Sequence, residues 1–231
     1  MLNIPKNTMI PKNQKERKEV NTIYGEQQKR FREKMTNSCT AEELPIIPAK
    51  VSDIYPISQK VSKQSEMSYG EIGTIGGAGC GPLAFEYALR VLDFSVEFEE
   101  IVHECVEKGY RAYIFDEENN IIDGCGTENC IFDVVAQELS GELNELISAL
   151  AEGPITLLVN NTIYHNDEKR RGNHFITMIG LNENGEAILM DGNLIVNDPS
   201  EALVMKDFRK LIPGIQTAWS WNKTKVKTYL K

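Results

Sequence analysis

The sequence lacks any run of about 18 apolar residues, which is the length that a membrane-spanning helix needs. We therefore expect no membrane insertion. The chain also lacks an excess of positive charge, because 25 Lys and Arg residues stand against 34 Asp and Glu residues, for a net charge of −9. A surface of this sign repels phosphate backbones, so we expect no nucleic-acid partner.

Cysteine is scarce, and its odd number prevents complete pairing. The five cysteines are Cys39, Cys80, Cys105, Cys125 and Cys130. The first ten residues lack the charged start and apolar stretch of a secretory signal. Reduced thiols and a cytoplasmic location are the resulting predictions. Cys125 and Cys130 are close in sequence, but no second cysteine pair or paired histidines completes a zinc site, so we expect no metal and no other cofactor.

The charge of the chain changes sign near residue 45. Basic residues outnumber acidic ones in residues 1–45, whereas acidic residues prevail in 46–231. The first part has few apolar positions, and Val20, Ile23 and Phe31 do not form a sustained helical stripe. We therefore expect residues 1–45 to be a solvated helix or a flexible arm outside the packed domain formed by 46–231. The alternative is a pro-segment that covers the site.

Hydrophobic periodicity changes halfway along the chain. Apolar residues at helical spacing predict helices at 82–94, 96–109, 128–139 and 143–153. Short β-rich runs separated by Asn, Gly and Asp turns follow at 154–160, 174–181, 186–191 and 194–198. This order, with helices first and an antiparallel sheet second, predicts an α+β fold rather than alternating βαβ units.

Cys80 stands in the glycine-rich stretch GTIGGAGCGP, immediately before a predicted helix. Exposed N–H groups and the positive end of the helix dipole stabilise an anion at this place, which favours a thiolate. The glycines would let a substrate backbone approach closely. A small residue that caps a helix is the alternative interpretation, but the surroundings make Cys80 the candidate nucleophile.

Three histidines are available as the general base. His103 lies between core positions of a predicted helix and His165 lies in a charged stretch, so we expect both at the surface. His174 opens the strand HFITMIGL, where a side chain stands at the edge of a sheet and can face a helix terminus. The sequence thus predicts a Cys80–His174 nucleophile pair.

Two aspartates compete to orient His174. If the run 174–181 turns at residues 182–185 and returns through 186–191, a simple hairpin brings Asp191 opposite His174. Asp198 follows seven positions later, and both aspartates also suit turns. Hairpin geometry gives Asp191 a slight preference over Asp198.

These residues resemble the C39-like, papain-type cysteine peptidase family. The similarity covers about residues 54–221, and its most specific parts are Gly-Cys-Gly-Pro before a helix and Gly-x-His-Phe at the start of a strand. The resemblance implies a papain-like α+β fold with Cys80 and His174 as catalytic residues. It also implies an aspartate in Asn-Asp-Pro, which Asp198 matches, whereas Asp191 has the usual spacing from the histidine.

The family also uses a glutamine upstream of the cysteine to stabilise the tetrahedral oxyanion. The position six residues before Cys80 is Thr74, so the resemblance assigns this role to Gln59, with Gln64 as the alternative.

The sequence therefore predicts a hydrolase of peptide or amide bonds, whose partner is its peptide or amide substrate. Cys80 would attack the carbonyl, His174 would move the proton and an aspartate would orient His174. Two alternatives remain open. One is an acyltransferase or transpeptidase on the same triad, and the other is a catalytically silent papain-like binding module.

Overall fold

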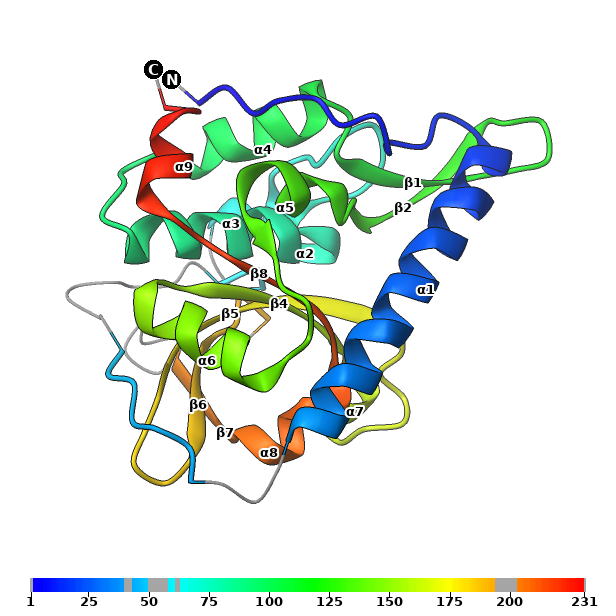
Figure 1. Ribbon diagram of the computed structural model, residues 1–231. Coiled ribbons are helices and arrows are strands. Elements are labelled where there is room, and N and C mark those ends of the chain that lie inside the picture. Colours follow the sequence, from blue (N-terminus) through cyan, green and yellow to red (C-terminus); the bar gives the residue numbers. More distant parts are fainter. Residues whose placement is uncertain (1, 40–42, 50–57, 61–62, 194–202, 231) are drawn as a thin grey trace.

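The computed structural model describes residues 2–39, 43–49, 58–60, 63–193 and 203–230 (Figure 1). Its helices are α1 (Gln14–Ser38), α2 (Ile75–Ala78), α3 (Cys80–Val91), α4 (Phe98–Glu107), α5 (Cys130–Val135), α6 (Leu143–Glu152), α7 (Asn161–His165), α8 (Phe208–Leu211) and α9 (Lys223–Lys227), with 3-10 helices at Lys63–Glu66 and Ile212–Gly214. Its strands are β1 (Arg111–Phe115), β2 (Ile121–Thr127), β3 (Gln137–Glu138), β4 (Ile155–Asn160), β5 (Asn173–Leu181), β6 (Glu186–Met190), β7 (Leu203–Asp207) and β8 (Ile215–Ser220).

A six-stranded antiparallel sheet has the order β3-β8-β4-β5-β6-β7. The helices of the first half pack beside it, so the predicted α+β class is confirmed. Strands β4, β5 and β6 coincide with three predicted β-rich runs, and the fourth run, 194–198, lies outside the described residues. The β1–β2 hairpin was not predicted, because Asp123, Gly124 and Gly126 interrupt the apolar pattern of β2.

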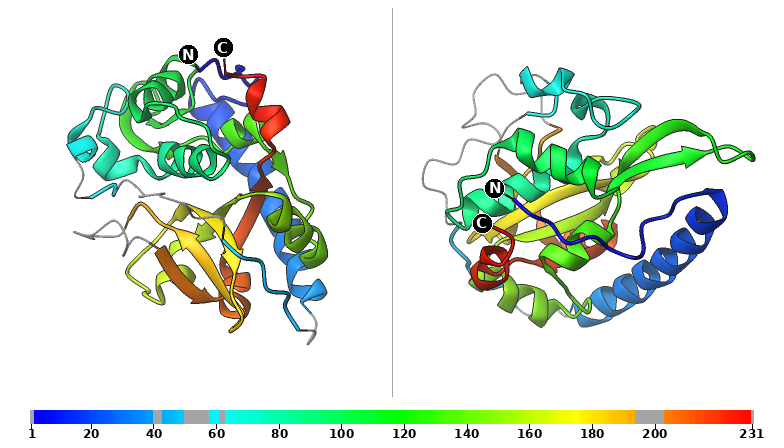
Figure 2. Two further views of the ribbon diagram at one scale, coloured as in Figure 1. Left: turned by 90° about the vertical axis from the view of Figure 1, so that its left-hand side faces the viewer. Right: turned by 90° about the horizontal axis from the view of Figure 1, so that it is seen from above.

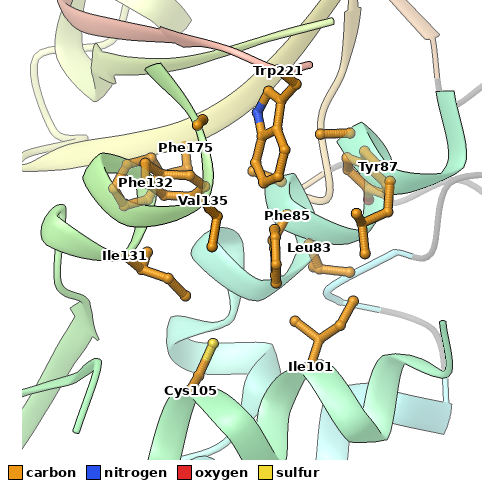
Figure 3. Close-up of a cluster of buried hydrophobic side chains, with 14 of the residues drawn as sticks. Leu83, Phe85, Tyr87, Ile101, Cys105, Ile131, Phe132, Val135, Phe175 and Trp221 are labelled. Atoms are coloured by element: carbon orange, nitrogen blue, oxygen red, sulfur yellow. The ribbon is translucent and has the colours of Figure 1, made fainter. Parts of the chain in front are cut away.

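The sheet separates two hydrophobic clusters, since neighbouring residues of a strand point to opposite faces. Along β5, Phe175 and Ile179 belong to the cluster beneath α3, α4 and α5, whereas Ile176 and Met178 belong to the cluster covered by α6 and α8. Figure 3 shows the first cluster, in which side chains of three helices meet. The residues labelled there are Leu83, Phe85, Tyr87, Ile101, Cys105, Ile131, Phe132, Val135, Phe175 and Trp221.

Helix α3 joins the helical half to the sheet. Its apolar residues follow the predicted helical spacing, and nearly all of its residues are buried. Thr177 Oγ1 of β5 donates a hydrogen bond to the Ala84 carbonyl at 3.1 Å. The helix begins at Cys80 rather than at Pro82, so the candidate nucleophile is part of its first turn.

The expectation that residues 1–45 lie outside the packed domain is wrong. Helix α1 runs along one side of the molecule from the helical half to the sheet half (Figures 1 and 2). Ile4 is buried in the first cluster, and Phe31 and Met35 are buried in the second. Only three of the 25 residues of α1 are buried, namely Val20, Phe31 and Met35. The mostly polar sequence of this helix therefore gave no signal that it packs against the domain. Among the described helices, α1 included, none is long and apolar enough to cross a membrane.

Candidate active site

Cys80 is held at the start of α3 by the junction with the short helix α2. The N–H of Gly79 donates to the Ile75 carbonyl at 2.8 Å, and the Gly79 carbonyl accepts from the N–H of Leu83 at 3.1 Å. This junction places the half-buried Cys80 thiol at the positive end of a 12-residue helix. The local sequence therefore supplies an environment that stabilises a thiolate.

Two glycines beside Cys80 allow other residues of the protein to pack closely against the backbone. A Cβ on Gly79 would lie 2.6 Å from Ile75 Cγ2, and a Cβ on Gly81 would overlap the side chain of Thr127. The prediction that these glycines admit a substrate backbone is therefore wrong for both positions. Their close contacts instead fix the backbone of Cys80.

His174 lies near the start of β5, opposite Val159 of β4. Its Nε2 lies 2.6 Å from Oδ1 of Asp191, and both side chains are almost completely buried. The Cys80 thiol lies near enough to His174 for each group to change the pKa of the other. Because Asp191 engages Nε2, the other ring nitrogen, Nδ1, is the one left for Cys80. The structure thus brings Cys80, His174 and Asp191 into one interacting series.

Cys80, His174 and Asp191 change one another's pKa values in the direction that favours their charged forms. Burial acts to raise the pKa of the Cys80 thiol, but the hydrogen bond and charge of His174 outweigh burial, and this pKa is lowered. Burial acts to lower the His174 pKa, but the charge and hydrogen bond of Asp191, helped by Cys80, raise it to about 10. Burial opposes ionisation of Asp191 too, yet His174 keeps the Asp191 pKa below its ordinary value. The site therefore favours a thiolate beside an imidazolium.

Asp191 is held by two further hydrogen bonds. The Tyr164 hydroxyl donates to Oδ2 at 2.9 Å, and the Asn193 backbone N–H donates to Oδ1 at 2.8 Å. Sequence reasoning missed Tyr164. The available signal was Asn160, whose side chain caps α7 by accepting a hydrogen bond from the N–H of Ile163 and so starts the turn that presents Tyr164.

The register of the β5–β6 hairpin differs from the predicted one. Thr177 pairs with Met190, which puts Asp191 level with Ile176 instead of His174. A turn at residues 182–185 without any irregularity already places residue 191 opposite residue 176, so the predicted pairing was two residues out. The bulge next to Met178 shifts the pairing by one residue on the side of the loop, where Leu181 pairs with Ala187. Asp191 nevertheless reaches His174, because diagonal neighbours in a sheet lie only about 7–8 Å apart. Asp198, the competing aspartate, lies outside the described residues.

Gln59 lies next to both parts of the candidate site. Its backbone N–H donates to the Gly192 carbonyl at 2.6 Å, and its Nε2 donates to the Gly76 carbonyl at 3.3 Å. The side chain is buried between the residue after Asp191 and the turn before Cys80. The alternative, Gln64, lies in the 3-10 helix Lys63–Glu66. Thr74 is an exposed residue that directly precedes α2.

The other two histidines occupy different environments. His103 is exposed on α4, as predicted. His165 is partly exposed, so it lies at the surface as predicted but is not fully solvated. Its ring centroid lies 4.7 Å from that of Tyr164 and 6.5 Å from that of His174. Burial and the nearby Arg170 lower the His165 pKa, so this side chain adds no positive charge beside His174 at neutral pH.

A cavity of about 370 Å³ opens beside Cys80. One wall is the face of α1 that carries Arg17, Asn21, Tyr24, Gly25 and Gln28. The opposite wall is residues 125–129, between β2 and α5, and Asn173 and Phe175 line the part next to Cys80. At this size the cavity belongs to the small end of ordinary ligand pockets, about 300–1,000 Å³.

Comparisons with protein-family models, curated proteins and solved structures found no match to this chain.

Proposed function

We propose that this protein is a cysteine peptidase or amide hydrolase with a papain-like fold of the C39-like type. The observation that carries the proposal is the series Cys80–His174–Asp191, in which Cys80 begins α3, His174 interacts with it, and Asp191 is hydrogen-bonded to His174. The lowered Cys80 pKa and the raised His174 pKa support a reactive thiolate. A silent binding module has no need for such a buried series of ionisable groups, whose desolvation is costly.

The first half of the reaction acylates Cys80. The thiolate attacks the carbonyl carbon of the substrate amide, an S–C bond forms, and the C=O electron pair moves to oxygen. The backbone N–H of Cys80 and the side-chain amide of Gln59 would stabilise this oxyanion. As the C–N bond breaks, the His174 imidazolium gives its proton to the leaving amine.

The second half releases the acid product. Neutral His174 takes a proton from water while the water oxygen attacks the thioester carbonyl. The S–C bond then breaks, the carboxylic acid leaves, and the thiolate–imidazolium pair is restored. Asp191 keeps His174 oriented and stabilises its charged form throughout.

The pH dependence of thiol alkylation tests this proposal. Iodoacetamide should label Cys80 rapidly at mildly acidic pH, because the thiolate is the reactive form. Cys125 provides an internal control, since the residue is accessible to the reagent and partial desolvation of its sulfur raises its pKa, the opposite of the shift at Cys80. Mass spectrometry of the digested protein would follow both cysteines at each pH.

The variant His174→Ala should lose the acidic reactivity of Cys80 and leave Cys125 unchanged. The variant Cys80→Ala should lose all turnover of a library of peptide amides while keeping its fold. If Cys80 reacts only at the alkaline pH that Cys125 requires, or if Cys80→Ala retains activity, the proposed function is wrong.

A further inference from the structure

The cavity beside Cys80 is closed on one side by α1, and this wall is firmly attached. Arg17 forms a two-bond ion pair with Glu128, with Nη1 2.8 Å from Oε2. The Tyr24 hydroxyl donates to Asp133 Oδ2 of α5 at 3.1 Å. Phe31 anchors the far end of the helix in the second hydrophobic cluster. These contacts hold α1 in place as one wall of the cavity.

Gly25 lies at the centre of this wall. Glycine in a helix interior is about 1 kcal/mol less favourable than alanine. Packing does not explain it, because a Cβ at Gly25 would meet no described atom within 4 Å. Its missing side chain leaves space in the cavity opposite Cys80. Because Gly25 is exposed, its missing side chain keeps the cavity open on the side of α1.

The reaction geometry decides which part of a substrate enters the cavity. The leaving amine must lie next to His174, because it receives the proton from that ring. Among the described residues that line the cavity, Cys80 is present and neither His174 nor Asp191 is. The cavity is therefore assigned to the acyl part of the substrate, on the face of Cys80 that the buried His174 ring does not occupy.

The size of the cavity limits that acyl part. A sphere of 370 Å³ is roughly 9 Å across, and an extended residue spans about 3.5 Å, so about two residues fit between Cys80 and α1. The amides of Asn21, Gln28 and Asn129 offer hydrogen bonds to a peptide main chain. A longer chain on this side would have to leave the cavity past α1.

We infer that the enzyme accepts a short acyl group and releases the first one or two residues of a peptide instead of cutting within a long chain. This inference rests on the function proposed above. Helix α1 acts as the stop for the acyl side of the substrate, and Gly25 sets the depth available before that stop.

Peptidyl chloromethyl ketones of increasing length test the inference, because they alkylate a reactive thiolate from the acyl side. A library of dipeptidyl probes should label Cys80 at least 100-fold faster than the same dipeptides extended by four residues at the amino end. The corresponding dipeptidyl amides should be hydrolysed with the same preference. Extended probes that react as fast as the dipeptidyl probes would overturn the inference.

A matched pair of variants tests the role of α1. Gly25→Phe should slow dipeptidyl labelling at least tenfold, whereas Glu26→Phe, which adds the same side chain at an exposed neighbour outside the cavity lining, should not. Gly25→Ala, which favours the helix, should give a smaller loss in the same direction. Equal effects of the two Phe variants would contradict the assignment of α1 as the stop.

Iodoacetamide separates failure of the inference from failure of the proposed function. This small reagent should label Cys80 equally fast in the wild type and in both Phe variants. Rapid iodoacetamide labelling without a length preference would reject only the role of α1. A Cys80 that no reagent labels at mildly acidic pH would reject the proposed function and this inference together.

Discussion

At the scale of single residues, Tyr164 acts on His174 only through Asp191. Its hydroxyl holds Oδ2 while His174 occupies Oδ1. A hydrogen bond to a charged group contributes about 1.5–3 kcal/mol. We therefore expect Tyr164→Phe to lower kcat at least tenfold and to leave KM nearly unchanged, because substrate contacts are not altered. The Phe variant retains the aromatic ring. It therefore keeps the contact with Lys206, whose Nζ lies 4.5 Å from the ring centroid.

Steady-state kinetics on a peptide amide would measure this effect. Tyr113→Phe is the matched control, since its hydroxyl accepts a hydrogen bond from the N–H of Glu71 at 3.1 Å on the β1–β2 hairpin. An equal fall in kcat for both variants, or a change in KM alone, would rule out a positioning role for Tyr164.

The sequence revealed the residues whose chemistry is local. Cys80 stood out because its activation depends on the helix that follows it, and His174 because it opens a strand. Tyr164 was not predicted, since its contact with Asp191 depends on a helix and a strand that are far apart in the chain. Asp191 was chosen from a predicted pairing with His174 that is two residues out of register, and it reaches His174 as a diagonal neighbour instead.

At the scale of elements, α1 is attached through two large side chains near its end. Phe31 is 4% exposed and Met35 is fully buried. Removing a buried aromatic or methionine side chain costs about 2–5 kcal/mol, because the lost contacts leave a cavity. Phe31→Ala should therefore lower the free energy of unfolding by about 3 kcal/mol or more, as measured by urea denaturation.

The control is Ile23→Ala on the same helix, where the side chain is 42% exposed. Its effect should stay within about 0.5 kcal/mol. Were Phe31→Ala as mild as Ile23→Ala, α1 would have to be the solvated arm that its composition predicted.

Elements with dense apolar periodicity were predictable. The run 143–153 corresponds closely to α6, and α3 and α4 lie within the predicted ranges apart from the first turn of α3. Helix α1 forms too, but its burial was not readable, because the buried positions Val20, Phe31 and Met35 are too widely spaced to form a stripe. These side chains pack against residues of the sheet that are far away in the sequence. The local sequence of α1 therefore contains no information about this contact.

At the scale of the whole molecule, Glu86 makes stability depend on pH. Burial of this α3 carboxyl outweighs its hydrogen bonds from Arg90 and raises its pKa from 4.5 to about 7. The folded state therefore holds this proton to a higher pH than the unfolded state. The free energy of unfolding should fall as pH rises from about 4.5 to about 7, by up to about 3 kcal/mol from this group.

Glu86→Gln should remove this contribution, so that the variant gains stability over the wild type as pH increases through this range. Thermal unfolding at several pH values would measure the difference. Glu107→Gln, at an exposed carboxyl in the last turn of α4, is the control and should keep the pH dependence of the wild type. A Glu86→Gln difference that does not change between pH 4.5 and 8 would refute the assignment.

The position of β8 has a consequence for the order in which the protein folds. This strand lies inside the sheet between β3 and β4, so the two parts of the sheet join only when residues 215–220 have been added. The segment at residues 2–3 depends on residues beyond β8, because the N–H of Asn3 donates to the carbonyl of Tyr229 at 2.8 Å and Leu2 pairs with Leu230. Both pairings join parts of the chain that are far apart in sequence, and contacts of this kind make folding slower than local contacts do.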